Sequence, residues 1–183
     1  FFVLFFSTAL FSQITVNSST GTTTPTTYTT LKASFDAINA GTHTGVILIS
    51  VTGNTTETNS CVLNASGTGS SNYSSIKITP NGGSTRVVSG TITAGLPLID
   101  LNGADNVTIN GLAINGDSLS IVNTTVSTTT GTSTIRFIAG ATNNLITNCS
   151  ILGSTTSLTS GVIFFSTDAS TGGIGNDLNK VRN

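Results

Sequence analysis

An internal repeat is the feature that most constrains the fold of this chain. The segment Asn106–Ile114 aligns with Asn143–Ile151, and a third copy begins at Asn179. The apolar positions of the first two copies match in the pairs Ile109 and Ile146, Leu112 and Cys149, and Ile114 and Ile151. Segments rich in Thr, Ser and Gly, such as 122–133, separate the copies unevenly. The repeat therefore predicts an irregular solenoid whose coils stack around one apolar core.

Short apolar runs indicate that the coils are made of β-strands. The first is Val46–Val51. Four shorter runs follow, and in each of them a polar or aromatic residue is flanked by apolar ones. These runs are Ile76–Ile78, Ile99–Leu101, Ile135–Phe137 and Ile163–Phe165. An antiparallel fold is the alternative, because Asn-Gly pairs that suit hairpin turns also occur. We predict a parallel arrangement, with inward positions at Ile109, Ile114, Ile146, Ile151 and Ile163.

Composition excludes two other classes of protein. Only 7% of the residues are charged and the net charge is -1, so the chain has no basic surface for nucleic acid. Apolar residues make up 37% and the mean hydropathy is +0.28, which is too hydrophobic for a disordered chain. A length of 183 residues fits one domain.

The chain begins with a mainly apolar run, Phe1–Phe11, which contains Ser7 and Thr8. A membrane-spanning helix needs about 20 such residues, whereas the apolar part of a signal peptide needs only about 7 to 15. We therefore predict that residues 1–12 are a signal-peptide remnant and that the mature chain begins near Gln13, with a buried strand as the alternative. This predicts passage through secretion machinery to the exterior or the outer cell surface, without a membrane span.

Three further segments are expected along the chain. Residues 13–30 should form a Thr-rich surface segment. Residues 31–41 should form a short amphipathic capping helix, because Leu31, Phe35 and Ile38 recur at helical spacing. Residues 46–183 should form the coils, truncated at the C-terminus because the third copy of the repeat is incomplete.

Together these features resemble the pectin-lyase-like right-handed parallel β-helices. The likeness rests on the helix at 31–41, the strand Val46–Val51 and the segment Gly53–Glu57, with later Asn-containing runs similar to the coils. The chain is also similar to the N-terminal part of large secreted or surface proteins of Bacteroidetes-type bacteria, many of which use type IX secretion. The resemblance implies an all-β, right-handed parallel β-helix with an N-terminal cap, and a structural role for Glu57. It leaves the activity open, because the fold carries lyases, hydrolases, esterases and noncatalytic adhesins.

The middle residues of the four short runs should form one outward column, comprising Lys77, Asp100, Arg136 and Phe164. One interpretation is that they form surface ion pairs between neighbouring coils, each contributing about 0 to 1 kcal/mol. The other is that they form a ligand-facing polar groove for a saccharide. The resemblance implies this second interpretation, since this face carries the substrate in pectin-lyase-like enzymes.

Two predictions concern corners and loops. Asn tolerates the left-handed backbone of sharp corners, so Asn106, Asn143 and Asn179 should stack as a structural ladder. The sequence Asp117-Ser118-Leu119 resembles the O-glycosylation motif of Bacteroidetes exported proteins. Ser118 is therefore a candidate glycosylation site.

No cofactor or metal site is predicted. A Ca²⁺ site shared by Asp100 and Asp105 is a weak alternative, because two carboxylates without a ligand loop seldom suffice. Cys61 and Cys149 should lie about 14 Å apart, beyond the roughly 7 Å limit for a disulfide, and both should be core residues. His43 has no second ligand at metal-binding spacing and is expected in a solvated loop.

The function predicted from these observations is that of a noncatalytic adhesin or carbohydrate-contacting scaffold. Its partner would be an extracellular polysaccharide or a cell-surface glycan. We assign no catalytic residues, because glycosidases need two carboxylates about 5 to 9.5 Å apart and the motifs of polygalacturonases and pectin esterases are absent. The alternative is the N-terminal part of a polysaccharide lyase or glycoside hydrolase whose catalytic residues lie beyond residue 183. An ice-binding solenoid is a third option, weakened because Thr91-Ile92-Thr93 is isolated.

Overall fold

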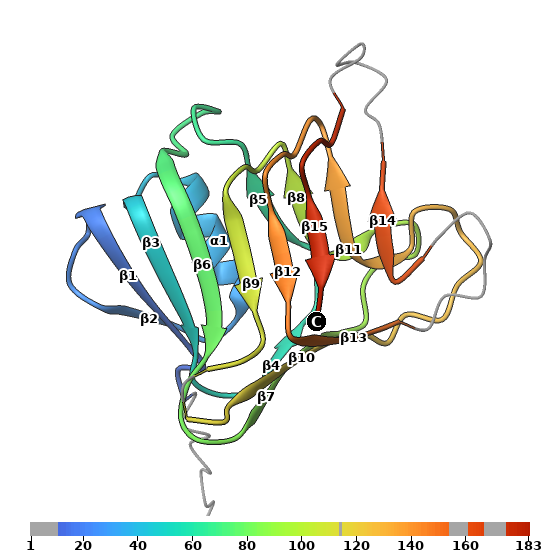
Figure 1. Ribbon diagram of the computed structural model, residues 1–183, viewed down its shortest axis with the longest axis horizontal. Helices are drawn as coiled ribbons and strands as arrows, with labels where there is room; N and C mark the ends of the chain where they lie inside the picture. The colour runs from blue at the N-terminus through green and yellow to red at the C-terminus, as the bar shows by residue number, and fades with distance from the viewer. Residues whose placement is uncertain (1–10, 114, 154–160, 167–174) are drawn as a thin grey trace, which may run out of the picture.

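Three β-sheets run along a stack of coils, and each coil contributes one strand to each sheet (Figure 1). This computed structural model describes residues 11–113, 115–153, 161–166 and 175–183. The described residues form an all-β parallel solenoid of about four turns with one short helix, which confirms the predicted fold class.

Sheet 1 is the largest of the three sheets. In spatial order it contains β15 (Lys180–Arg182), β12 (Leu145–Thr147), β9 (Val107–Asn110), β6 (Tyr73–Pro80), β3 (His43–Val51), β1 (Ile14–Gly21) and β2 (Thr26–Tyr28). Sheet 2 contains β13 (Cys149–Gly153), β10 (Ser118–Asn123), β7 (Thr85–Gly90) and β4 (Thr55–Glu57). Sheet 3 contains β14 (Ile163–Phe165), β11 (Ser133–Ile138), β8 (Pro97–Asn102) and β5 (Cys61–Asn64).

The core consists of inward columns, because parallel pairing keeps equivalent residues of successive coils in register. One column in sheet 3 comprises Cys61, Ile99, Ile135 and Ile163. In the next column Phe137 stacks on Phe165, with ring centroids 4.7 Å apart. Four of the five predicted inward residues pack in or against the core, namely Ile109, Ile146, Ile151 and Ile163. The fifth, Ile114, lies outside the described residues.

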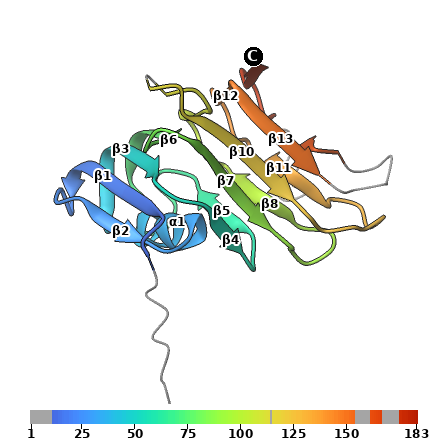
Figure 2. The same ribbon diagram turned by 90° about the horizontal axis from the view of Figure 1, so that it is seen from below.

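The helix α1 (Leu31–Asn39) covers the N-terminal end of this core, as predicted (Figure 2). Its apolar side chains Leu31, Phe35 and Ile38 have no exposed surface. The hydroxyl of Thr30 accepts a hydrogen bond from the Ala33 amide at 3.1 Å and caps the first turn.

Glu57 joins the helix to the first coil. Its carboxylate accepts hydrogen bonds from the backbone N–H groups of Leu31 and Lys32, at 2.8 and 3.1 Å. The Glu57 side chain is buried, and negative charge is favoured at a helix N-terminus. The predicted structural role of Glu57 agrees with these contacts.

The segment 13–30 differs from the predicted surface segment, because it contains two strands of sheet 1. Strand β1 pairs antiparallel with β3, and β2 pairs antiparallel with β1. Ile14 and Val16 are completely buried. Their alternation with polar residues gives β1 one core face, and the two strands extend the N-terminal cap beside α1.

His43 lies at the start of β3 and is completely buried, so the prediction of a solvated loop residue is wrong. Its Nε2 atom is 2.7 Å from the Tyr28 hydroxyl, and its Nδ1 atom is 3.2 Å from the Ser18 hydroxyl. Both partners lie on the strands of 13–30. The His43 imidazole therefore links β1 and β2 to the first coil through side-chain hydrogen bonds.

The predicted repeat alignment holds only as far as Asn110. Strand β12 pairs with β9 in the predicted register, including Ile146 opposite Ile109. Beyond it, Cys149 stands opposite Leu119 rather than Leu112, and Ile151 stands opposite Ile121 rather than Ile114. In the third coil, Leu112 instead forms an isolated antiparallel bridge with Ser118.

The predicted signal remnant falls largely on residues 1–10, outside the described residues, so it stays a prediction. Within the described part of the chain, no helix has the length and apolar character to cross a membrane.

Candidate functional site

The predicted outward column is only partly correct. Asp100, Arg136 and Phe164 do stand opposite one another on β8, β11 and β14 of sheet 3. Val62 takes the place before Asp100 in this column. Lys77 lies on β6 in sheet 1, between Leu48 and Thr108, so its assignment to the column is wrong. The short runs belong to two different sheets, and sequence spacing alone does not separate them.

Asp100 and Arg136 form a bidentate ion pair. Arg136 donates from Nε to one carboxylate oxygen at 2.9 Å and from Nη2 to the other at 2.7 Å. Only 8% of the Asp100 side chain and 17% of the Arg136 side chain are exposed. Because the two groups satisfy each other and are mostly buried, we assign the pair a structural role between the second and third coils.

The predicted asparagine ladder exists in a shifted form. Asn106 and Asn143 both have left-handed backbone, with φ of 58° and 55°, and the Asn143 amide donates to the Asn106 side chain. The left-handed position of the next coil is Leu178, not Asn179. Asn179 instead accepts hydrogen bonds from the backbone and side chain of Asn144.

The remaining predicted sites do not converge on a common centre. Ser118 lies at the start of β10, with its hydroxyl 2.7 Å from that of Thr85, and its glycosylation stays a prediction. Asp105 accepts hydrogen bonds from the amide and hydroxyl of Thr142, whereas Asp100 is engaged by Arg136. Among the described residues, no three His, Cys, Asp or Glu side chains gather as a metal cluster.

Both cysteines are free thiols, as predicted. Cys61 is fully buried, and burial followed by the nearby Glu57 carboxylate raises the pKa of its thiol well above the ordinary value. Cys149 is half-buried, and burial raises the pKa of its thiol to about 11. Both groups are therefore neutral and poorly nucleophilic at physiological pH.

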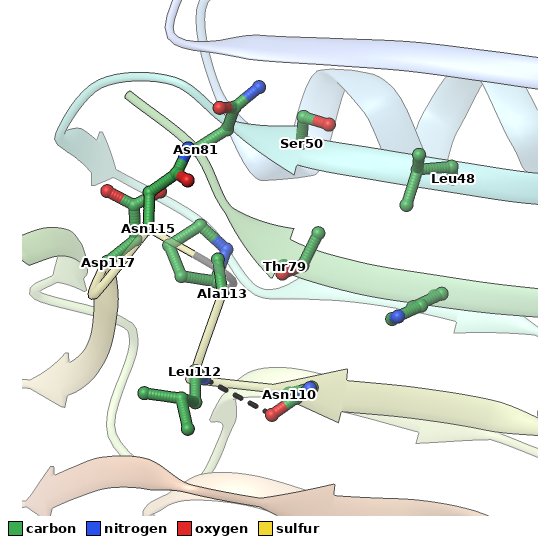
Figure 3. A pocket seen from close by; sticks show the side chains of 11 residues that line it. Leu48, Ser50, Thr79, Asn81, Asn110, Leu112, Ala113, Asn115 and Asp117 are labelled. Atoms are coloured by element: carbon green, nitrogen blue, oxygen red, sulfur yellow. Dashed lines mark hydrogen bonds between the residues drawn. The ribbon is translucent and has the colours of Figure 1, made fainter. Parts of the chain in front are cut away.

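A groove of about 360 Å³ lies on the outer face of sheet 1 (Figure 3). Its volume falls within the usual range of ligand sites, roughly 300 to 1,000 Å³. Its lining residues are Leu48, Ser50, Lys77, Thr79, Pro80, Asn81, Asn110, Leu112, Ala113, Asn115 and Asp117. The groove spans the first three coils, since these residues come from β3, from β6 and Asn81 after it, from β9 and from the loop after β9.

Parallel stacking places polar groups along the floor of this groove. Ser50 stands opposite Thr79, and Asn110 is the next outward residue of the same row. Lys77 lies two residues before Thr79 on the same outer face and is exposed. The Asn110 side-chain oxygen accepts hydrogen bonds from the Leu112 amide and the Asn148 side chain, which fixes the loop that follows.

The loop after β9 supplies one wall. Leu112 is 56% exposed, and Leu48 on the opposite side of the groove is 38% exposed. The turn Asn115–Gly116 follows, with Gly116 in left-handed backbone, and leads into Asp117. Asp117 as a residue is 1% exposed, and neither of its carboxylate oxygens has a hydrogen-bond partner.

Sequence reasoning missed Leu112 and Asp117 as groove residues. Leu112 was assigned to the core by the repeat alignment, and Asp117 was considered only as part of a glycosylation motif. The Asn-Gly pair at Asn115 was the available signal, because a tight turn there interrupts the repeat.

Comparisons with protein-family models, curated proteins and solved structures find no match to this chain.

Proposed function

We infer that this solenoid is a noncatalytic carbohydrate-contacting protein, and that the groove on sheet 1 holds a polysaccharide or cell-surface glycan. The observation that carries the inference is the combination of a hydroxyl and amide floor with two exposed leucines at the edges. Sugars present hydroxyl groups and apolar C–H faces, so a floor containing Thr79 and Asn110 between Leu48 and Leu112 matches both.

The same face offers positive charge further along the coils. Lys77 and Lys180 occupy one outward row of sheet 1, three coils apart. Arg182 lies two residues after Lys180 on β15, in the neighbouring row that contains Asn110. At about 4.8 Å per coil, the two lysines are separated by about 14 Å. This spacing favours an extended ligand that lies along the solenoid and tolerates anionic groups.

The chemistry of the groove favours binding over cleavage. Glycoside hydrolysis ordinarily uses two carboxylates about 5 to 9.5 Å apart. Asp117 is the single carboxylate among the residues that line the groove. A lyase or hydrolase remains the second candidate, and the experiment below distinguishes it by its products.

The proposal includes an exported, pectin-lyase-like β-helix protein delivered to the exterior or the outer surface, for instance by type IX secretion. The parallel coils, the N-terminal capping helix and the apolar run Phe1–Phe11 support it. N-terminal sequencing of the exported protein should give a start near Gln13. An exported product that retains Phe1 would contradict this part of the proposal.

Affinity electrophoresis against neutral and uronate-containing polysaccharides tests the binding site. Leu112→Ala should weaken binding about 5-fold, equivalent to about 1 kcal/mol of apolar contact. Lys77→Gln should weaken binding of anionic polysaccharides more than that of neutral ones.

Matched surface variants provide the controls. Val126 is 77% exposed and distant in sequence from the groove, and Lys32 lies on α1. Val126→Ala and Lys32→Gln should leave binding unchanged. Binding that the groove variants do not alter would refute the assignment, and polysaccharide cleavage by the wild type would favour the enzyme.

A further inference from the structure

Asp117 presents a buried carboxyl group that the fold does not explain. The residue is 1% exposed, and both carboxylate oxygens lack a hydrogen-bond partner. Buried carboxylates are strongly disfavoured unless they are hydrogen-bonded, ion-paired or bound to a metal. Asp117 therefore lacks the partner that a buried carboxylate normally has.

Neighbouring basic side chains do not supply that partner. Among the described residues, the ion pairs are Lys32 with Asp36 and Arg136 with Asp100. Lys77 lines the same groove without forming an ion pair with Asp117. Arg86, on β7, stands opposite Leu119, and it directs its Nε–H to the backbone oxygen of Asn81 at 2.9 Å.

The burial of the carboxylate limits the size of the partner. Both Asp117 oxygens are closed to water, so a sugar hydroxyl cannot approach them at the usual distance of about 2.7 to 2.8 Å. A Ca²⁺ ion lies closer to its ligands, at about 2.3 to 2.6 Å. A small bare cation therefore fits this position better than the carbohydrate proposed for the open part of the groove.

Two asparagines lie at the same end of the groove as Asp117. Figure 3 shows Asn81, Asn115 and Asp117 together at one end of the groove, away from Leu48. Carboxylate and amide carbonyl oxygens are the ligands that Ca²⁺ prefers, whereas Mg²⁺ retains more of its water. We propose that Asp117, Asn115 and Asn81 form a Ca²⁺ site at this end of the groove. This proposal is independent of the carbohydrate proposal.

The site should be weak and should bind one ion per chain. It has one carboxylate, and Ca²⁺ affinity rises with the number of charged ligands. We expect a Kd of about 10⁻⁴ to 10⁻³ M, the range of extracellular modules. At about ten times Kd, Ca²⁺ should raise the folding equilibrium constant about eleven-fold.

The full 183-residue chain is first stripped of metal with a chelator and exchanged into chelator-free buffer. Isothermal titration calorimetry with CaCl₂ then measures binding. Urea unfolding with and without Ca²⁺, at constant ionic strength, measures the effect on stability. Asp117→Asn keeps the shape of the side chain and should abolish both responses. In chelator this variant should be more stable than the wild type, because a neutral amide costs less to bury than a carboxylate that has no partner. Asn115→Ala should weaken the binding of Ca²⁺ while leaving the chain folded.

Asp36→Asn is the matched control, since the Asp36 side chain is 55% exposed on α1. This variant should bind Ca²⁺ like the wild type. Equal responses of the wild type and Asp117→Asn would overturn the proposal, as would an equal stabilisation of the wild type by MgCl₂. Neither result would affect the carbohydrate proposal, whose readout is glycan binding.

Discussion

Replacing Glu57 tests whether the helical cap and the first coil form one cooperative unit. The Glu57 carboxylate is buried and accepts two backbone hydrogen bonds from the first turn of α1. Hydrogen bonds to charged groups contribute about 1.5 to 3 kcal/mol each, and buried donors left without an acceptor add to the loss. We expect Glu57→Ala to lower the free energy of unfolding by about 3 to 5 kcal/mol.

Two matched variants separate charge from general disturbance of the cap. Glu57→Gln retains one acceptor oxygen and the side-chain shape, so it should cost about 1 to 2 kcal/mol. Asp36→Ala removes an exposed ion pair with Lys32 from the same helix, and it should cost less than about 0.5 kcal/mol.

Urea unfolding followed by circular dichroism gives the free energies. Amide hydrogen exchange of Leu31 and Lys32 locates the effect, because these two N–H groups lose their acceptor in Glu57→Ala. A Glu57→Ala variant within about 1 kcal/mol of the wild type, with both amides still protected, would refute the role assigned to Glu57.

Three further predictions concern the coils. Asp100→Leu should cost about 3 kcal/mol in urea unfolding, because Arg136 is left mostly buried without its partner, whereas adding Arg136→Leu should recover most of the loss. Gly111→Ala should lower the unfolding free energy by about 2 to 3 kcal/mol, since a Cβ atom there would meet the backbone oxygen of Asn148; retained stability would exclude that contact. Because the folded state raises the pKa of Cys149 from 9.0 to about 11, its stabilising contribution is present below pH 9 and lost as pH rises towards 11. Cys149→Ala should reduce this alkaline loss in urea titrations, and an unchanged pH profile would contradict the assignment.

The parts of the fold that were predictable from sequence depend on local periodicity. Leu31, Phe35 and Ile38 recur at the helical period, and all three are buried on α1. Ile109 and Ile146 recur with the repeat, and they stand opposite each other in sheet 1. In both cases the burial of one face determines the pattern, so the sequence carries the signal directly.

Pairing between distant segments was not predictable in the same way. Strand β1 carries an apolar alternation at Ile14 and Val16, but its Thr and Ser content is equally compatible with a loop. Only its antiparallel pairing with β3 makes it part of the sheet. His43 was misassigned for the same reason, because Ser18 and Tyr28 lie far from it in sequence.

The candidate groove was missed because it depends on a departure from the repeat. If the third coil followed the predicted register, Leu112 would be a core residue and Asp117 would have no groove to line. Leu112 instead forms a bridge with Ser118 and is exposed, and Asp117 lines the same groove as the row formed by Ser50, Thr79 and Asn110. The repeat therefore determines the scaffold, whereas its interruption places the side chains that distinguish this face from the rest of the solenoid. On this basis, deleting the loop should leave the solenoid folded and remove the groove, which separates the stability of the fold from the binding functions proposed for it.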